Sequence, residues 1–239
     1  WLADIIGLAM PVIRSPRSYN SQIGVPLSVW KLDDKFRLGI FEAGISMPGE
    51  MEKLERIIRP DIGVITNIGD AHGENFSDNE TKAREKLKLF KNTPTIVYSG
   101  DQQIIHRLLN ESRKDRKGLI DWSFEREDAA IRVSRRNSPE AGTEIGMTYQ
   151  GHSHEFTIPF TDRASVENAV TAASVCLALD ISPDIIGKGL SSLVSVAMRM
   201  EIRNGIRNCL LIEDFYNSDP GSLGMALEYL KTQNGRKTT

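Results

Sequence analysis

Polar side chains that could bind a divalent cation follow two apolar segments in the first third of the chain. Glu42 comes directly after Leu38–Phe41, and Asn67 and His72 follow Gly63–Ile65. If both segments are strands of one parallel sheet, their carboxyl ends lie at the edge where such sheets bind ligands. Carboxylate oxygen suits Mg²⁺, and a neutral imidazole can bind a metal or contact a phosphate. The pattern predicts a Mg²⁺ site shared by Glu42 and His72, although a helix cap and a surface histidine are equally simple explanations.

A basic helix is predicted after this second cluster, over residues 81–90. Its buried stripe is expected to comprise Ala83, Leu87 and Phe90. Lys86 lies at the border of the stripe, where a lysine ordinarily lays its methylenes on the core and its ammonium in water. Three other lysines are expected to point further toward water: Lys82, Lys88 and Lys91.

A last polar cluster follows an apolar segment near the end of the chain. Asp214 ends this segment, and Tyr216 and Asn217 come directly after it. Asp219 and Pro220 are typical of an N-cap and a first helical residue. Capping explains Asp219 and Pro220, and it leaves Tyr216 and Asn217 available for ligand contacts.

The elements that must position these residues follow from the hydrophobic pattern. Apolar runs at 12–13, 38–41, 63–65 and 95–98 predict strands, and the segments 1–9, 24–32, 49–58, 81–90 and 102–109 predict helices. Regular alternation of the two indicates an α/β fold with a doubly wound, mostly parallel sheet. Later segments predict antiparallel edge strands at 118–122, 130–133, 144–149 and 154–158, then helices at 166–179 and 183–193, a strand at 208–214 and a helix at 220–230.

Composition narrows the function classes. With 30 Lys+Arg against 32 Asp+Glu, the net charge of −2 offers no basic excess for a nucleic-acid partner. No apolar run approaches the roughly 18 residues of a spanning helix, so no membrane insertion is expected. No signal-peptide pattern is present, which favours the cytoplasm. Cys176 and Cys209 lie in apolar runs and are expected to be buried, reduced thiols.

Taken together, the four clusters resemble the central domain of the Mur ligases. The resemblance rests on Glu42 within EAGISMPGE, the segment TNIGDAH ending at His72, Lys86, and the segment DFYNSDP beginning at Asp214. NSQIGVPL and MRME, beginning at Asn20 and Met198, are also similar to family segments. The resemblance implies a P-loop NTPase-like, ATP-binding domain over residues 1–198. It also implies that residues 199–239 begin a truncated, Rossmann-like C-terminal ligase domain.

The resemblance implies a role for each polar residue. Glu42 and His72 match the Mg²⁺ ligands, and Lys86 matches a lysine that is carbamylated to supply a metal-bridging carboxylate. Asn67 matches a residue near the ATP phosphates. The remaining matches surround the nucleotide: Asn168 and Arg199 near it, and Asp214, Tyr216 and Asn217 on the adenosine.

Within the family, the chain most resembles ligases that add D-alanyl-D-alanine to UDP-N-acetylmuramoyl-tripeptide, a form that some bacteria fuse to an alanine racemase. ATP would phosphorylate the tripeptide carboxylate, and the amine of D-alanyl-D-alanine would displace phosphate. One departure is that no segment matches the phosphate loop G-x-x-x-x-G-K-[ST], which the family carries just before the position of Trp1. The isolated chain, which starts within a predicted helix, is therefore expected to bind Mg-ATP weakly or not at all and not to ligate.

Three alternatives remain open from the sequence. A folylpolyglutamate synthetase-like ligase would share the architecture but differ in its substrate-binding domain. A hydrolase could use the segment 70–74 as a metal site and would act without ATP. A non-catalytic α/β binding module would fold in the same way and lack ligase activity.

Overall fold

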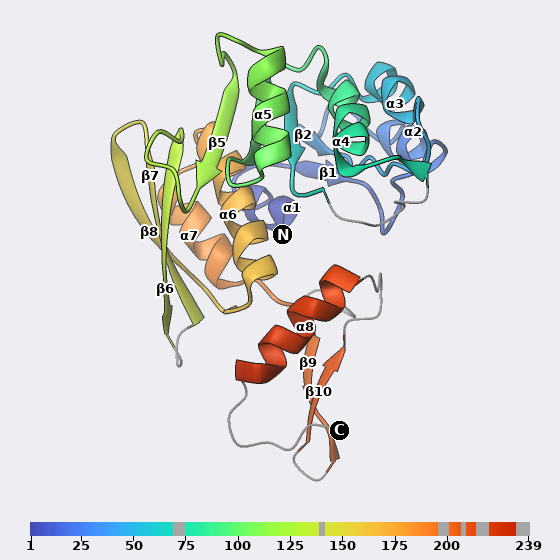
Figure 1. Cartoon of the computed structure of the whole chain (residues 1–239). Helices are drawn as coiled ribbons and strands as arrows, with labels where there is room; N and C mark the ends of the chain where they lie inside the picture. Colours follow the sequence, from blue (N-terminus) through green and yellow to red (C-terminus); the bar gives the residue numbers. More distant parts are fainter. Residues whose placement is uncertain (69–74, 139–141, 196–200, 207–208, 214–219, 233–239) are drawn as a thin grey trace.

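The computed structural model describes residues 1–68, 75–138, 142–195, 201–206, 209–213 and 220–232 (Figure 1). Its helices are α1 (Leu2–Ile6), α2 (Gly24–Val29), α3 (Glu50–Ile58), α4 (Asn79–Leu87), α5 (Gln103–Ser112), α6 (Arg163–Ala178), α7 (Pro183–Ser191) and α8 (Pro220–Thr232). Its strands are β1 (Val12–Arg14), β2 (Leu38–Ile40), β3 (Ile62–Ile65), β4 (Thr95–Ser99), β5 (Leu119–Ser123), β6 (Ile131–Ser138), β7 (Gly142–Tyr149), β8 (His152–Ile158), β9 (Glu201–Asn204) and β10 (Leu210–Glu213). A 3-10 turn, Lys88–Phe90, follows α4.

The main sheet has six strands in the order β3-β4-β5-β6-β7-β8. The pairs from β3 to β6 are parallel, and β7 and β8 extend the sheet in antiparallel fashion. A separate parallel pair, β1-β2, precedes it in the chain, and β9 and β10 form an antiparallel pair. The predicted α/β fold with a mostly parallel sheet is confirmed.

The direction of two strands differs from the sequence-based expectation. The hydrophobic pattern predicts antiparallel edge strands at 118–122 and 130–133, but β5 runs parallel to β4 and β6 runs parallel to β5. β5 follows the crossover helix α5, and such a connection returns the chain in the same direction. Antiparallel pairing begins only at the β6-β7 hairpin.

Helices cover both faces of the parallel strands. On one face, α4 and α5 bury a cluster that includes Ile96 and Tyr98 of β4. On the other face, α1, α6 and α7 pack on Val97 and Trp122 in the largest core cluster. Figure 1 shows α6 and α7 side by side next to β6, β7 and β8, with β9, β10 and α8 grouped apart from the main sheet. Neighbouring residues of β4 therefore face different helices, as in a doubly wound sheet.

The two cysteines differ in environment. Cys176 is buried in α6, as expected, and burial raises the pKa of its thiol to about 12. Cys209 is exposed, so the expectation that it is buried was wrong. Cys209 precedes β10 in a two-stranded ribbon, which lacks the covering layers that surround α6. β9, the partner strand of this ribbon, was not anticipated from the sequence, and the domain boundary near Met198 falls outside the described residues.

Within the described part of the chain, no helix combines the length and the apolar character needed to cross a membrane.

Candidate active site

A cleft of about 2500 Å³ opens at the carboxyl ends of β2 and β3. Four of the residues selected from the sequence line it: Glu42, Asn67, Lys86 and Asn168. They come from the loop after β2, the loop after β3, α4 and α6. The other five selected residues lie outside the described part of the chain: His72, Arg199, Asp214, Tyr216 and Asn217.

The Glu42 carboxylate is held by the loop that follows the neighbouring strand β1. Nδ2 of Asn20 donates a hydrogen bond to Oε1 of Glu42 at 2.8 Å. The Glu42 N–H donates to Oγ of Ser15 at 3.3 Å, and the Gly44 N–H donates to the Asn20 carbonyl at 2.8 Å. A Cβ on Gly44 would stand 3.0 Å from Cγ of Asn20, so this glycine leaves room for the amide. Asn20 thus orients Glu42, a role that its sequence position alone did not reveal.

The Glu42 carboxylate suits Mg²⁺ chemistry. Oε1 of Glu42 accepts the hydrogen bond from Asn20. Oε2 of Glu42 receives no hydrogen bond from the residues that the structure describes. Mg²⁺ typically uses one or two carboxylates and keeps several waters, so one exposed carboxylate in a cleft fits such an ion. The described residues contain no group of three or more His, Cys, Asp or Glu side chains able to hold a metal. The site shared by Glu42 and His72 stays a prediction because His72 is outside the described ranges.

Lys86 reaches the loop after β3. Its Nζ donates to the Asn67 carbonyl at 3.3 Å. Nε2 of Gln102, the residue before α5, donates to the neighbouring Thr66 carbonyl at 2.7 Å. Burial lowers the pKa of Lys86, and the nearby Lys82 ammonium lowers it further. Side chains from two helical segments therefore fix the backbone at this edge of the cleft.

Lys82 does not point to water as expected. Its side chain is 3% exposed, and it lines the same cleft as Lys86. The expected stripe is only partly realised, because Ala83 is fully buried whereas Leu87 and Phe90 remain half-buried. The helix ends at Leu87 and continues as a 3-10 turn, so the helical period used for the expectation does not extend to Phe90.

Glu85 ties α4 to the loop that begins with Glu42. It is 5% exposed, and its Oε1 accepts the Gly49 N–H at 2.7 Å. Its Oε2 forms an ion pair with Nζ of Lys88 at 2.8 Å. Gly49 has φ of +84°, a left-handed conformation that favours glycine. The Glu85 contact therefore fixes the segment of Glu42 relative to the helix of Lys86, and no local pattern in the sequence indicates it.

Residues 2–176 match the family described as "Mur ligase middle domain". The chain belongs to the Mur ligase family. This finding confirms the resemblance drawn from the four sequence clusters.

Curated relatives of this Mur ligase chain include proteins named "UDP-N-acetylmuramoyl-tripeptide--D-alanyl-D-alanine ligase". The protein of Bacillus subtilis (strain 168) is 27% identical over 234 residues, which cover 97% of this chain and 49% of the relative. The protein of Escherichia coli (strain K12) is 25% identical over 247 residues, which cover 98% of this chain and 52% of the relative. The chain therefore spans about half the length of these relatives.

Solved structures share the fold. MurF from Acinetobacter baumannii superposes with a TM-score of 0.86 at 23% identity, covering 98% of this chain and 51% of that one. MurF ligase from Thermotoga maritima, solved in complex with ADP, superposes with a TM-score of 0.81 at 21% identity. The match covers 96% of this chain and 53% of that one. Folylpolyglutamate synthase from Thermotoga maritima superposes with a TM-score of 0.70 at 13% identity. The match covers 96% of this chain and 62% of that one. At these identities the likeness concerns the fold alone. The folylpolyglutamate synthetase-like ligase, one of the alternatives left open by the sequence, therefore has the same fold.

Asn168 occupies the second turn of α6 in this Mur ligase domain. Its side chain is exposed at the cleft. The N-cap Asp162 accepts the Ser165 N–H at 2.8 Å, which sets the start of the helix. α6 therefore presents Asn168 to the cleft from a helix whose following residues, from Ala169 to Leu177, are buried.

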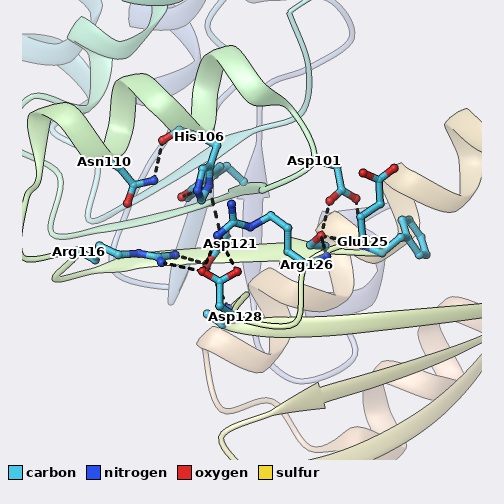
Figure 2. Close-up of polar contacts among 12 residues, drawn as sticks. Asp101, His106, Asn110, Arg116, Asp121, Glu125, Arg126 and Asp128 are labelled. Carbon is cyan, nitrogen blue, oxygen red and sulfur yellow. Dashed lines mark hydrogen bonds and ion pairs between the residues drawn. The ribbon is translucent and has the colours of Figure 1, made fainter.

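A second polar cluster of this Mur ligase domain lies away from the cleft, between α5 and β5 (Figure 2). Asp121 is fully buried, and its Oδ1 accepts from Arg116 at 3.0 Å and from the Ala130 N–H at 3.1 Å. Nδ1 of His106 lies 3.8 Å from the other carboxylate oxygen and 3.2 Å from the Tyr98 hydroxyl. Burial lowers the pKa of His106 despite the nearby Asp121, and burial raises the pKa of Tyr98 to about 12. These groups join α5 to β4, to β5 and to the loop between α5 and β5.

Proposed function

We propose that this chain is the ATP-binding middle domain of a ligase that joins D-alanyl-D-alanine to UDP-N-acetylmuramoyl-tripeptide. The observation that carries the proposal is the convergence of Glu42, Asn67, Lys86 and Asn168 on one cleft in a Mur ligase chain. The name of the curated relatives from Bacillus subtilis and Escherichia coli supports the choice of substrates.

In the proposed reaction, ATP phosphorylates the tripeptide carboxylate, and the amine of D-alanyl-D-alanine displaces phosphate to form an amide. Glu42, oriented by Asn20, and His72 would hold Mg²⁺. When bound, the ion would neutralise phosphate charge. Lys86 would be carbamylated, which turns a cation into an anion at the edge of the metal site. Catalysis then depends mainly on positioning and charge neutralisation.

The remaining assignments follow the family positions. Asn67 would contact the phosphates. Asn168 and Arg199 would lie near the nucleotide, and Asp214, Tyr216 and Asn217 would contact adenosine. In this assignment residues 1–198 form the ATP-binding domain, and residues 199–239 begin the C-terminal ligase domain. We place the reaction in the cytoplasm, where ATP and UDP-linked precursors are available.

The test is phosphate release by the complete ligase that contains this chain, with ATP, Mg²⁺ and both substrates. Lys86→Ala should lower kcat by about 100-fold or more, as expected for loss of a charged group at a phosphoryl-transfer site. A short carboxylate such as acetate should restore part of the rate. Lys91→Ala is the matched control, because Lys91 is exposed and is not among the described residues that line the cleft.

Three outcomes would contradict the proposal. Glutamate addition to a folate, with no reaction of the UDP-linked tripeptide, would indicate a folylpolyglutamate synthetase-like enzyme. Hydrolysis without ATP would indicate the metal hydrolase. Equal, mild effects of Lys86→Ala and Lys91→Ala would make Lys86 an ordinary surface lysine.

A further inference from the structure

The outer side of α2 is apolar and exposed. Ile23, Leu27 and Trp30 are 75%, 49% and 86% exposed, and their spacing of four and three residues places them on one side of the helix and its caps. The opposite side carries Val25, which belongs to a buried core cluster with Leu54 of α3. α2 is therefore anchored through one side, while Ile23, Leu27 and Trp30 form an exposed stripe on the other, which we call the α2 stripe.

The sequence around the α2 stripe lacks charge. No Asp, Glu, Lys, Arg or His occurs from residue 18 to residue 30, although 26% of the whole chain is charged. A helix face that stays in water usually carries charged or polar side chains. Large apolar side chains without charged neighbours are typical of the centre of an interface, where tryptophan contributes strongly to binding. The α2 stripe therefore has the composition of a docking surface.

The α2 stripe also borders the cleft. Gln22, directly before the stripe, lines the cleft, and so does Leu32, two residues beyond the other end of the stripe. Asn20, which orients Glu42, belongs to the same segment as Gln22. A folded part seated on the α2 stripe would therefore lie at the rim of the cleft, close to the carboxylate proposed to bind Mg²⁺.

We propose that the α2 stripe is the docking face for the part of the complete ligase that lies outside this chain and brings the UDP-linked substrate to the cleft. The inference rests on the proposed function, which supplies that substrate. The chain matches 49% of the Bacillus subtilis relative and 52% of the Escherichia coli relative, so about half of each relative is available to cover such a face. A UDP-linked tripeptide extends well beyond a metal site, so the part that holds its remainder lies at the rim of the cleft.

Hydroxyl-radical footprinting of the complete ligase, read by mass spectrometry, tests whether the stripe is covered. Trp122 is the internal control, because it is the same residue type as Trp30 and is 1% exposed. Trp30 should be oxidised less than about threefold faster than Trp122, as expected for a side chain at the centre of an interface. Faster oxidation of Trp30 would leave the stripe in solvent and would overturn the inference.

The footprint also has to distinguish the ligase itself from a second copy. Light scattering gives the mass of the protein at each concentration used for the footprint. Protection of Trp30 in the monomer supports the inference, whereas protection confined to a dimer would assign the stripe to a second copy and overturn it. The footprint needs no substrate, so its result is separate from that of the proposed function, which fails if the wild-type ligase does not consume the UDP-linked tripeptide.

Steady-state kinetics of the complete ligase test the link to the substrate. Trp30→Ser should raise KM for the UDP-linked tripeptide about tenfold and KM for ATP less than about twofold, because the docked part holds only the former. Leu8→Ser is the matched control, since Leu8 is 48% exposed, lies between α1 and β1, and is not among the described residues that line the cleft. Thermal unfolding by circular dichroism identifies a misfolded variant, in which case Leu27→Ser replaces Trp30→Ser. Equal effects of the stripe and control substitutions, or an effect on ATP alone, would overturn the inference.

Discussion

Replacing Glu85 by alanine should destabilise the chain more than most substitutions in α4. Glu85 is 5% exposed, and its Oε1 accepts the Gly49 N–H at 2.7 Å. Removing a charged acceptor leaves a half-buried donor unpaired, which costs about 2 to 3 kcal/mol. The ion pair with Lys88 adds little, because the lysine is partly exposed and screened ion pairs contribute weakly. For a chain of this length the midpoint of thermal unfolding should fall by about 8 °C.

The assay is urea unfolding followed by circular dichroism and tryptophan fluorescence. Glu85→Gln keeps an acceptor oxygen for the Gly49 N–H and should lose about half as much stability as Glu85→Ala. Lys88→Met removes the ion pairs of Lys88 with Glu85 and Glu52, leaves the Gly49 contact in place, and should stay close to the wild type. If Glu85→Ala changed the unfolding free energy by less than about 0.5 kcal/mol, the contact would not hold the loop to the helix. In that case Glu85 would not fix the loop of Glu42 relative to Lys86.

Three further substitutions test separate parts of the structure. Asn20→Ala should raise the Mg²⁺ concentration for half-maximal ligase activity about tenfold, since the partner that orients Glu42 is lost; an unchanged Mg²⁺ titration would show that Asn20 does not orient the carboxylate. Gly49→Ala should cost about 1 kcal/mol in urea unfolding, because φ is +84° while no atom lies within 4 Å of the added Cβ; full wild-type stability would mean that the loop relaxes. Burial lowers the pKa of His106 below its ordinary 6.5, so the unfolded chain binds the proton first and stability falls as pH drops through 6.5. His106→Gln should reduce that fall between pH 7 and 5, and an identical pH profile would refute the assignment.

The parallel half of the fold could be predicted because its signals are local. Apolar runs and helical periods located β1 to β4 and the helices between them to within a few residues. Strand direction is different, because it depends on the connection and not on the residues of the strand. Ile131 and Val133 are buried and Arg132 is exposed in β6, so the expected alternation is real, yet β6 runs parallel to β5. The pattern identified the strand, but the antiparallel direction inferred from it was wrong.

The candidate site also contains residues that local sequence signals identify and residues that only long-range contacts reveal. Glu42 and Asn67 follow apolar strands, and the rule that ligands bind at the carboxyl edge of a sheet was sufficient to select them. Asn20 and Glu85 act over longer separations, on Glu42 and Gly49, and no periodicity in the sequence connects those positions. Lys82 was misplaced because a lysine in a charge-rich helix is ordinarily solvated, whereas here the packing of the helix turns it into the cleft.

In the proposed function, the state of Lys86 bears on metal binding. As an ammonium on the cleft that Glu42 also lines, Lys86 would oppose the binding of Mg²⁺ near that carboxylate. As a carbamate, Lys86 would instead add a negative charge to this part of the cleft. The proposed carbamylation would therefore link CO₂ to metal binding. A lysine that only anchored the Asn67 carbonyl would need neither CO₂ nor the metal.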